Sequence, residues 1–224
     1  MRIARIHSAG ELADRIQSSG ILPLFANGID GWSVEEATPA SYWFSEDRDG
    51  PWEWKGPAIV KTHCAYGKFF NGKTGFISRQ WYPDFANWRR KGYDFDAAMD
   101  DGLVTLSESY VYETLQRSGY ILSKDLKNLC RTREFSRSSY DAIIARLERK
   151  GYVITINFEY DMGSDGRPYG WGNARLATPE QYFGSRFREH VYDRTPEDSR
   201  RRLEALLKRK IGIVGDRQKK WILG

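Results

Sequence analysis

Arginine and serine side chains recur between residues 131 and 167 in a pattern that suits contact with nucleic acid. Arginine can donate paired hydrogen bonds to a phosphate or to the edge of guanine, and serine can contact phosphates or base edges. We therefore expect DNA contact from residues in and beside one predicted helix and one predicted hairpin turn. The candidate DNA-binding set is Arg131, Arg133, Arg137, Ser138, Arg149 and Arg167.

Two carboxylates among aromatic residues could supply acid–base chemistry. Glu53 lies in the segment PWEWK, and Asp84 lies in WYPDFANWRR. A carboxylate in apolar surroundings can have a raised pKa that suits general acid or base catalysis, and base-flipping enzymes need positioned polar groups. Glu53 and Asp84 are therefore the catalytic candidates. The alternative is that the aromatic rings form core and that the polar groups beside them are their partners.

The same aromatic segment could hold a base or another flat ligand by stacking. Tyr82, Trp88 and Tyr93 lie close in sequence to Arg89. Unpaired bases stack on aromatic rings, and arginine adds a charge that attracts phosphate. These four residues form a candidate stacking pocket.

The motifs of common hydrolases and metal proteins are absent. The chain has no Walker phosphate loop, no Gly-x-Ser-x-Gly elbow and no His-Glu-x-x-His helix. His63 and Cys64 supply one adjacent pair, whereas a structural zinc site needs four ligands. We expect no metal and no cofactor.

The periodicity of residues 137–150 predicts the helix that would present part of the DNA-binding set. Its apolar residues follow the i, i+3, i+4, i+7 spacing of one helix face, and Gly151 can end it. The opposite side, with Ala142, Ala145 and Arg149, is expected to face a DNA groove, flanked by Asp141 and Glu148. The apolar face is Tyr140, Ile143, Ile144 and Leu147.

The surrounding elements predict a winged-helix unit. Helices are expected at 107–119 and 123–131, and a strand from residue 152 precedes a turn at 161–172 and a return strand. Three helices followed by a hairpin is the order of the winged-helix variant of the helix-turn-helix, whose third helix enters a DNA groove.

A similar order is predicted upstream. Helical patterns cover 8–20, 33–44 and 51–63, although Pro57 is expected to interrupt the third. Asn71-Gly72 is the dipeptide that two-residue hairpin turns prefer, and Pro83 favours a connecting helix over 81–92. The predicted fold class is helix-rich α+β: a tandem winged helix, three helices plus a β-hairpin occurring twice, with a helical C-terminal arm.

The predicted domains are 1–104, an N-terminal winged-helix-like unit, 105–178, a C-terminal winged helix, and 179–224, a basic helical arm and tail. Within the arm, residues 195–224 hold nine basic and four acidic side chains, which equals the net charge of +5 of the whole chain. The basic excess that could neutralise phosphate therefore belongs to the arm. Its last residues, from 212 onward, are expected to be mobile.

The sequence suggests no membrane association. No apolar run reaches transmembrane length, and the N-terminal residues lack the apolar stretch of a signal peptide. We expect a cytoplasmic protein.

Two segments resemble a bacterial family described as AlkZ-related. They are residues 51–97, which begin PWEWKGPAIVKTH, and residues 168–184, PYGWGNARLATPEQYFG. The resemblance implies a distant kinship to bacterial winged-helix DNA glycosylases, which excise alkylated or crosslinked bases and are built from tandem winged helices. Those enzymes position water with a Gln-x-Gln motif, and no two glutamines of this chain are two residues apart.

Three functions are compatible with these patterns. The first is a non-enzymatic, DNA-associated winged-helix protein. The second is an enzyme of the DNA-glycosylase kind with a rearranged site around Glu53 and Asp84. The third is an interaction scaffold whose partner is another protein or a second copy of the chain, and which touches no nucleic acid. Whether the chain is an enzyme is left open, with the missing Gln-x-Gln motif favouring the first function.

Overall fold

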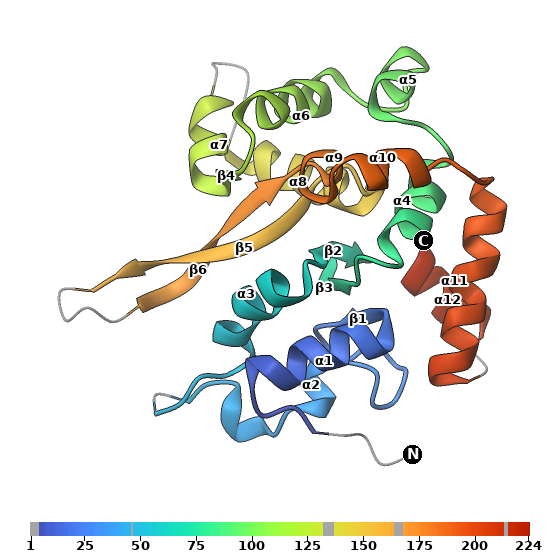
Figure 1. The fold of residues 1–224 in the computed structure, drawn as a ribbon. Coiled ribbons are helices and arrows are strands. Elements are labelled where there is room, and N and C mark those ends of the chain that lie inside the picture. Colours follow the sequence, from blue (N-terminus) through green and yellow to red (C-terminus); the bar gives the residue numbers. More distant parts are fainter. Residues whose placement is uncertain (1–4, 46, 132–136, 164–167, 213–214) are drawn as a thin grey trace.

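The fold is a helix-rich α+β arrangement around a six-stranded antiparallel sheet, seen here in a computed structural model (Figure 1). The structure describes residues 5–45, 47–131, 137–163, 168–212 and 215–224. The strand order across the sheet is β1-β3-β2-β5-β6-β4. The strands are β1 (Ile21–Pro23), β2 (Ala65–Phe70), β3 (Lys73–Ile77), β4 (Ile121–Leu122), β5 (Ile154–Met162) and β6 (Pro168–Ala177).

The helices of the first half begin where the sequence indicates, but one is shorter than predicted and another lacks its predicted interruption. The predicted helix over 33–44 is a single turn, α2 (Val34–Ala37), followed by a 3₁₀ turn, η1 (Ala40–Tyr42). The third, α3 (Pro51–Thr62), runs through Pro57, so the expected interruption is wrong. Pro57 is exposed, and the helix loses one internal hydrogen bond there without breaking. The first helix is α1 (Ala9–Ser19).

The hairpin and the connecting helix of the first half are confirmed. Asn71 and Gly72 have φ of 48° and 83°, the two positive values that the tight turn between β2 and β3 requires. Next comes α4 (Tyr82–Arg90), with proline in its first turn. A short helix that the sequence did not indicate, α5 (Phe95–Asp100), follows it.

The second half contains the predicted helix over 137–150 with its expected bounds. That helix is α8 (Arg137–Lys150), preceded by α6 (Leu106–Ser118) and α7 (Ser123–Leu129). The residues of its apolar face are all buried, which confirms the predicted periodicity. Thr105, just before the predicted start, caps α6 by accepting a hydrogen bond from the Glu108 N–H.

The two halves repeat one order of elements. Each runs helix, short strand, helix, helix and hairpin, and each contributes three neighbouring strands, β1-β3-β2 and β5-β6-β4. The halves join where β2 pairs with β5 at Tyr66 and Thr155. Across this junction α3 packs against β5 and α8 packs against β2. The short strands β1 and β4 span three and two residues, too few to show a period-two pattern.

The C-terminal arm folds back onto the sheet. Its helices are α9 (Pro179–Phe183), α10 (Ser185–His190), α11 (Pro196–Ile211) and α12 (Asp216–Leu223). The expected mobile end is wrong, because Ile222 and Leu223 of α12 are buried and Trp221 stacks on Phe70 with ring centroids 5.6 Å apart. Among the described residues, no helix is long and apolar enough to cross a membrane.

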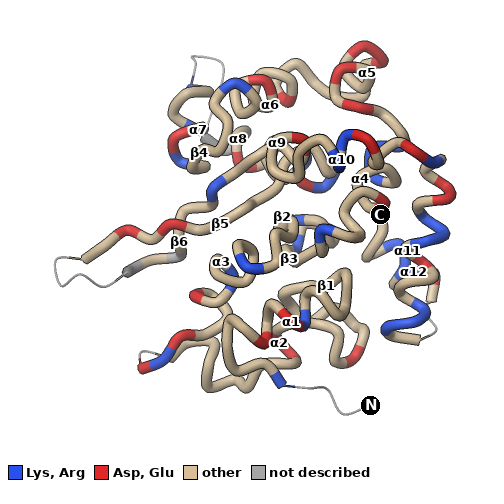
Figure 2. The backbone as a smooth tube through the Cα atoms, viewed as in Figure 1, with Lys and Arg blue, Asp and Glu red and all other residues tan. Residues whose placement is uncertain are grey.

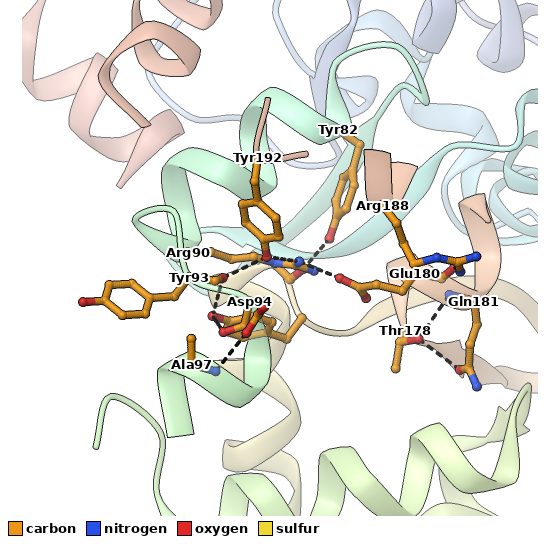
Figure 3. A network of polar contacts seen from close by, with 12 residues as sticks. Tyr82, Arg90, Tyr93, Asp94, Ala97, Thr178, Glu180, Gln181, Arg188 and Tyr192 are labelled. Atoms are coloured by element: carbon orange, nitrogen blue, oxygen red, sulfur yellow. Dashed lines mark hydrogen bonds and ion pairs between the residues drawn. The ribbon is translucent and has the colours of Figure 1, made fainter. Parts of the chain in front are cut away.

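A buried guanidinium connects α4 to the second half and to the arm (Figure 3). Arg90 Nη1 donates to Glu180 Oε1 at 2.6 Å and to the Tyr192 hydroxyl at 2.8 Å. Its Nη2 and Nε both donate to the Gly151 carbonyl, which lies between α8 and β5. The Tyr82 hydroxyl donates to the same carbonyl at 3.0 Å. The Glu180 carboxylate and the neighbouring tyrosines raise the pKa of Arg90 despite its burial, so the charge is retained.

Replacing this guanidinium should strongly destabilise the fold. Arg90→Met leaves Glu180 without its cation and the Gly151 carbonyl without its charged donor, so we expect a loss of about 3–5 kcal/mol in the free energy of unfolding. Urea denaturation measures it. The control is Arg117→Ala, because that guanidinium is 68% exposed and 3.9 Å from Glu113. It should shift stability by less than about 0.5 kcal/mol, and equal effects of the two changes would contradict this role of Arg90.

Candidate functional site

A basic cleft of about 1090 Å³ lies where α4, α8, α12 and the β2–β3 turn approach one another. Figure 2 shows Lys and Arg gathered along α11 and α12 on this side of the molecule. Among the described residues, no Asp or Glu side chain lines the cleft. The cations that define the basic cleft are Lys73, Arg89, Arg149, Arg217 and Lys220.

Arg89 forms the half-buried floor of the basic cleft. Its Nη2 donates to the Phe69 carbonyl at 2.7 Å and to the Ile222 carbonyl at 3.2 Å, which fixes the guanidinium between β2 and α12. Its Nε is buried without a hydrogen-bond partner. Burial and then the nearby charge of Arg149 lower the pKa of Arg89 to about 10. A guanidinium disfavoured in this way gains stability when an anion binds beside it.

The other cations of the basic cleft are exposed and come from separate elements. Arg149 lies in the last turn of α8, Lys73 starts β3, and Arg217 and Lys220 lie on α12. Within the described part of the chain, none of them has a carboxylate within ion-pair distance. Surface arginines and lysines without acidic partners concentrate positive potential, which attracts phosphate groups.

The basic cleft holds charge but little reactive chemistry. Its described lining offers no carboxylate, histidine, cysteine or serine that could act as acid, base or nucleophile. The arrangement can therefore bind an extended anion and position it, with Trp221 as an aromatic wall.

The other residues of the DNA-binding set lie away from the basic cleft or outside the described residues. Arg131 is exposed just after α7, near the start of α8. Arg133 and Arg167 fall outside the described residues, and so do the side chains of Arg137 and Ser138. Arg149 is the one member of the set that the described structure places in the basic cleft. DNA contact by the rest stays a prediction.

One flank of the α8 side that was expected to face a groove is covered by β2, although Ala142 and Arg149 on that side are exposed. Glu148 is 4% exposed, accepts a hydrogen bond from the Lys68 N–H at 3.2 Å and lies 3.4 Å from the Thr155 hydroxyl. Burial raises the pKa of Glu148 to about 7, although these hydrogen bonds and the charge of Lys68 oppose the rise. Glu148 thus belongs to the contact between halves and not to the flank of an open groove.

The four residues of the candidate stacking pocket do not surround one cavity. Tyr82 has no exposed surface, so its ring offers no face to a base. Trp88 Nε1 donates to the Leu223 carbonyl at 2.9 Å, and Arg200 covers its ring at 5.0 Å. Tyr93 is half-buried at the end of the α4 segment, and a hydrogen bond with Asp101 raises its pKa. Arg89 is the member of this group that serves the basic cleft.

The two candidate catalytic carboxylates have different surroundings. Glu53 is exposed and caps α3, because its Oε2 accepts from the Gly50 N–H at 2.8 Å. Asp84 is 2% exposed and lies beside Arg194 and Arg202, with nitrogen–oxygen distances of 3.2 Å and 3.1 Å. Asp84 lines a second cavity of about 690 Å³ between α4, α10 and the start of α11. We call it the Asp84 cavity.

The sequence model of the family described as AlkZ related matches residues 6–224, nearly the whole chain. The chain belongs to the AlkZ-related family. No curated protein and no solved structure matches it. The residues of the basic cleft in this AlkZ-related chain lie both inside and outside the two segments on which the resemblance rests, since Arg149, Arg217 and Lys220 are separate from them.

Lys73 and the tryptophan of α12 were missed by sequence reasoning. Lys73 directly follows the Asn71-Gly72 turn, and this neighbourhood could have placed it at the edge of a hairpin. Trp221 carries no local signal, because its role in the AlkZ-related fold depends on the packing of α12 against β2.

The buried Glu148 of this AlkZ-related protein should make stability depend on pH. The folded-state pKa of about 7 is above the ordinary 4.5. The folded protein therefore holds the proton more tightly, and stability is lost as pH rises from about 4.5 through 7. Glu148→Gln keeps the shape without the charge. We expect this variant to exceed the wild type by at most about 3 kcal/mol at pH 8 and to match it near pH 4.5.

Urea denaturation at several pH values measures this difference. Glu53→Gln is the matched control, because it removes an exposed carboxylate. Parallel stability profiles for the wild type and Glu148→Gln would contradict the burial argument.

Proposed function

We propose that this AlkZ-related chain is a DNA-associated protein without catalysis of its own, made of two winged-helix units that hold the DNA backbone in the basic cleft. The observation that carries the proposal is the cleft itself. Five cations converge on it from four parts of the fold, and no described acidic side chain lines it.

The order of elements supports two winged-helix units. In each half a helix precedes a short strand, and this strand pairs beside the later hairpin. The second hairpin, β5–β6, is long and projects from the body of the molecule (Figure 1). A projecting hairpin next to a third helix is the arrangement in which winged helices meet DNA.

The charge distribution supports contact with DNA phosphates in preference to recognition of base edges in a DNA groove. On the described part of the projecting hairpin, Glu159 and Asp161 are paired with Arg175 and Lys124, so this part offers no excess of positive charge. In the last turn of α8, Glu148 packs against β2, whereas the neighbouring Arg149 is exposed and can contact an anion. Phosphate contacts fix a protein on DNA without reading its sequence.

Membership in the AlkZ-related family supports DNA as the partner, since the resemblance implies kinship to DNA glycosylases. The absence of the Gln-x-Gln motif supports a role without base excision. The basic cleft also supports a role without base excision, because its described lining contains no candidate acid, base or nucleophile.

Duplex binding should weaken with salt, and the cleft should account for part of the slope. Each phosphate contact contributes about 0.9 to the slope of log affinity against log salt on B-DNA. Arg149→Ala should remove about one phosphate contact from this slope and weaken binding to all DNA sequences alike. Arg131→Ala tests in the same way whether DNA phosphate is contacted near the start of α8. Fluorescence anisotropy with a labelled duplex across a salt series measures these effects.

Arg117→Ala is the control, because it removes the same charge from a distant exposed site on α6. A loss with Arg131→Ala and none with Arg149→Ala would move the DNA site to the start of α8. No binding by the wild type would overturn the proposal and favour the protein-interaction scaffold.

A further inference from the structure

We propose that the Asp84 cavity is a second anion site, which takes a phosphate monoester group carrying two negative charges. Its volume is about 690 Å³, and its lining combines side chains from α4, α10 and α11 with the turn before α4. The basic cleft and this cavity are separate sites. Asp84 and Arg89 are five residues apart on α4, so their side chains point about 140° apart around the helix.

The charges that line the cavity match a dianion. The lining contains four arginines and two aspartates, which leaves two positive charges in excess when His190 is neutral. They are Arg79, Arg186, Arg194 and Arg202, with Asp84 and Asp193. A phosphate monoester carries close to two negative charges at neutral pH, whereas a phosphodiester carries one. The cavity therefore favours the monoester.

The two aspartates are already engaged by neighbouring side chains. Arg194 contacts Asp84 through Nη1 at 3.2 Å and Asp193 through Nη2 at 3.3 Å. Asp193 also lies 3.5 Å from His190 Nδ1. These contacts hold the cluster together and reduce the repulsion that a bare carboxylate would exert on an incoming anion.

Three donors remain for a ligand. Within the described residues, Arg79 and Arg186 have no carboxylate partner, and both are exposed at the cavity. Ser78 also lines the cavity, is 7% exposed, and has a hydroxyl buried without a hydrogen-bond partner. A buried hydroxyl without a partner is costly, and a phosphate oxygen would satisfy it. Arginine and serine are also common donors to phosphate.

The experiment titrates the full chain with AMP, inorganic phosphate and adenosine by isothermal titration calorimetry. AMP should bind and adenosine should not, because the monoester group supplies the interaction. Arg186→Ala and Arg79→Ala should each weaken AMP binding at least about tenfold. Ser78→Ala is a smaller change that should also weaken it. Thermal melts confirm that each variant is folded.

Two controls separate this site from the basic cleft. Arg117→Ala and Arg149→Ala remove the same charge elsewhere and should leave AMP binding unchanged. Arg186→Ala should in turn leave the salt slope of duplex binding unchanged. These variants therefore test the phosphate site and the DNA site separately.

A second comparison identifies the source of the phosphate. A single-stranded oligonucleotide with a 5′-phosphate that binds tighter than AMP and tighter than its 5′-hydroxyl counterpart would identify a strand end. Equal binding of AMP and the phosphorylated oligonucleotide would identify a free nucleotide. AMP binding no tighter than adenosine binding, or unaffected by both arginine variants, would overturn the proposal.

Discussion

The positions of both cavities depend on the hydrogen bonds of the buried Arg90 guanidinium. A charge enclosed among α4, α9 and the turn between α8 and β5 must have its donors satisfied, and Glu180, Tyr192 and the Gly151 carbonyl do this. These partners fix the rotation of α4 about its axis. Because α4 also bears Asp84 and Arg89, its rotation decides which side chain enters which cavity.

The contact between the two halves imposes a second constraint. Helices α3 and α8 each lie against the first hairpin strand of the other half, so close approach of backbones is required. A Cβ atom at Gly56 would lie 3.1 Å from the Asn157 side chain, and one at Gly67 would lie 3.4 Å from the carboxyl carbon of Glu148. Glycine at these two positions leaves room for side chains of the other half. The same closeness encloses Glu148, which explains why a carboxylate on an amphipathic helix loses its water.

The sequence predicted the elements that have strong local signals and missed what depends on distant contacts. The helix over 137–150 was predicted from its apolar spacing, and the hairpin at Asn71-Gly72 from its turn residues. The burial of Glu148 was missed, although it lies four residues after Ile144 and thus continues the apolar face. The anchoring of α12 was missed because eight residues with three cations look like a solvated tail until Phe70 is placed beside Trp221.

For the candidate sites too, the sequence indicated individual residues but not how the fold brings them together. Residue type indicated Arg89, Arg149 and Asp84, but not that the first two share a cleft while the third faces another cavity. Such convergence is a property of the tertiary fold, because the contributing residues are separated by dozens of positions in the chain.

The pairing of β2 with β5 also determines what a fragment of this protein would do. A piece ending near residue 104 would expose the edge of β2 that pairs with β5 at Tyr66, beside the apolar surface that β5 and α8 cover in the full chain. An open strand edge of this kind recruits another strand from solution. The second half therefore covers a strand edge of the first half that would otherwise be open to pairing with another chain.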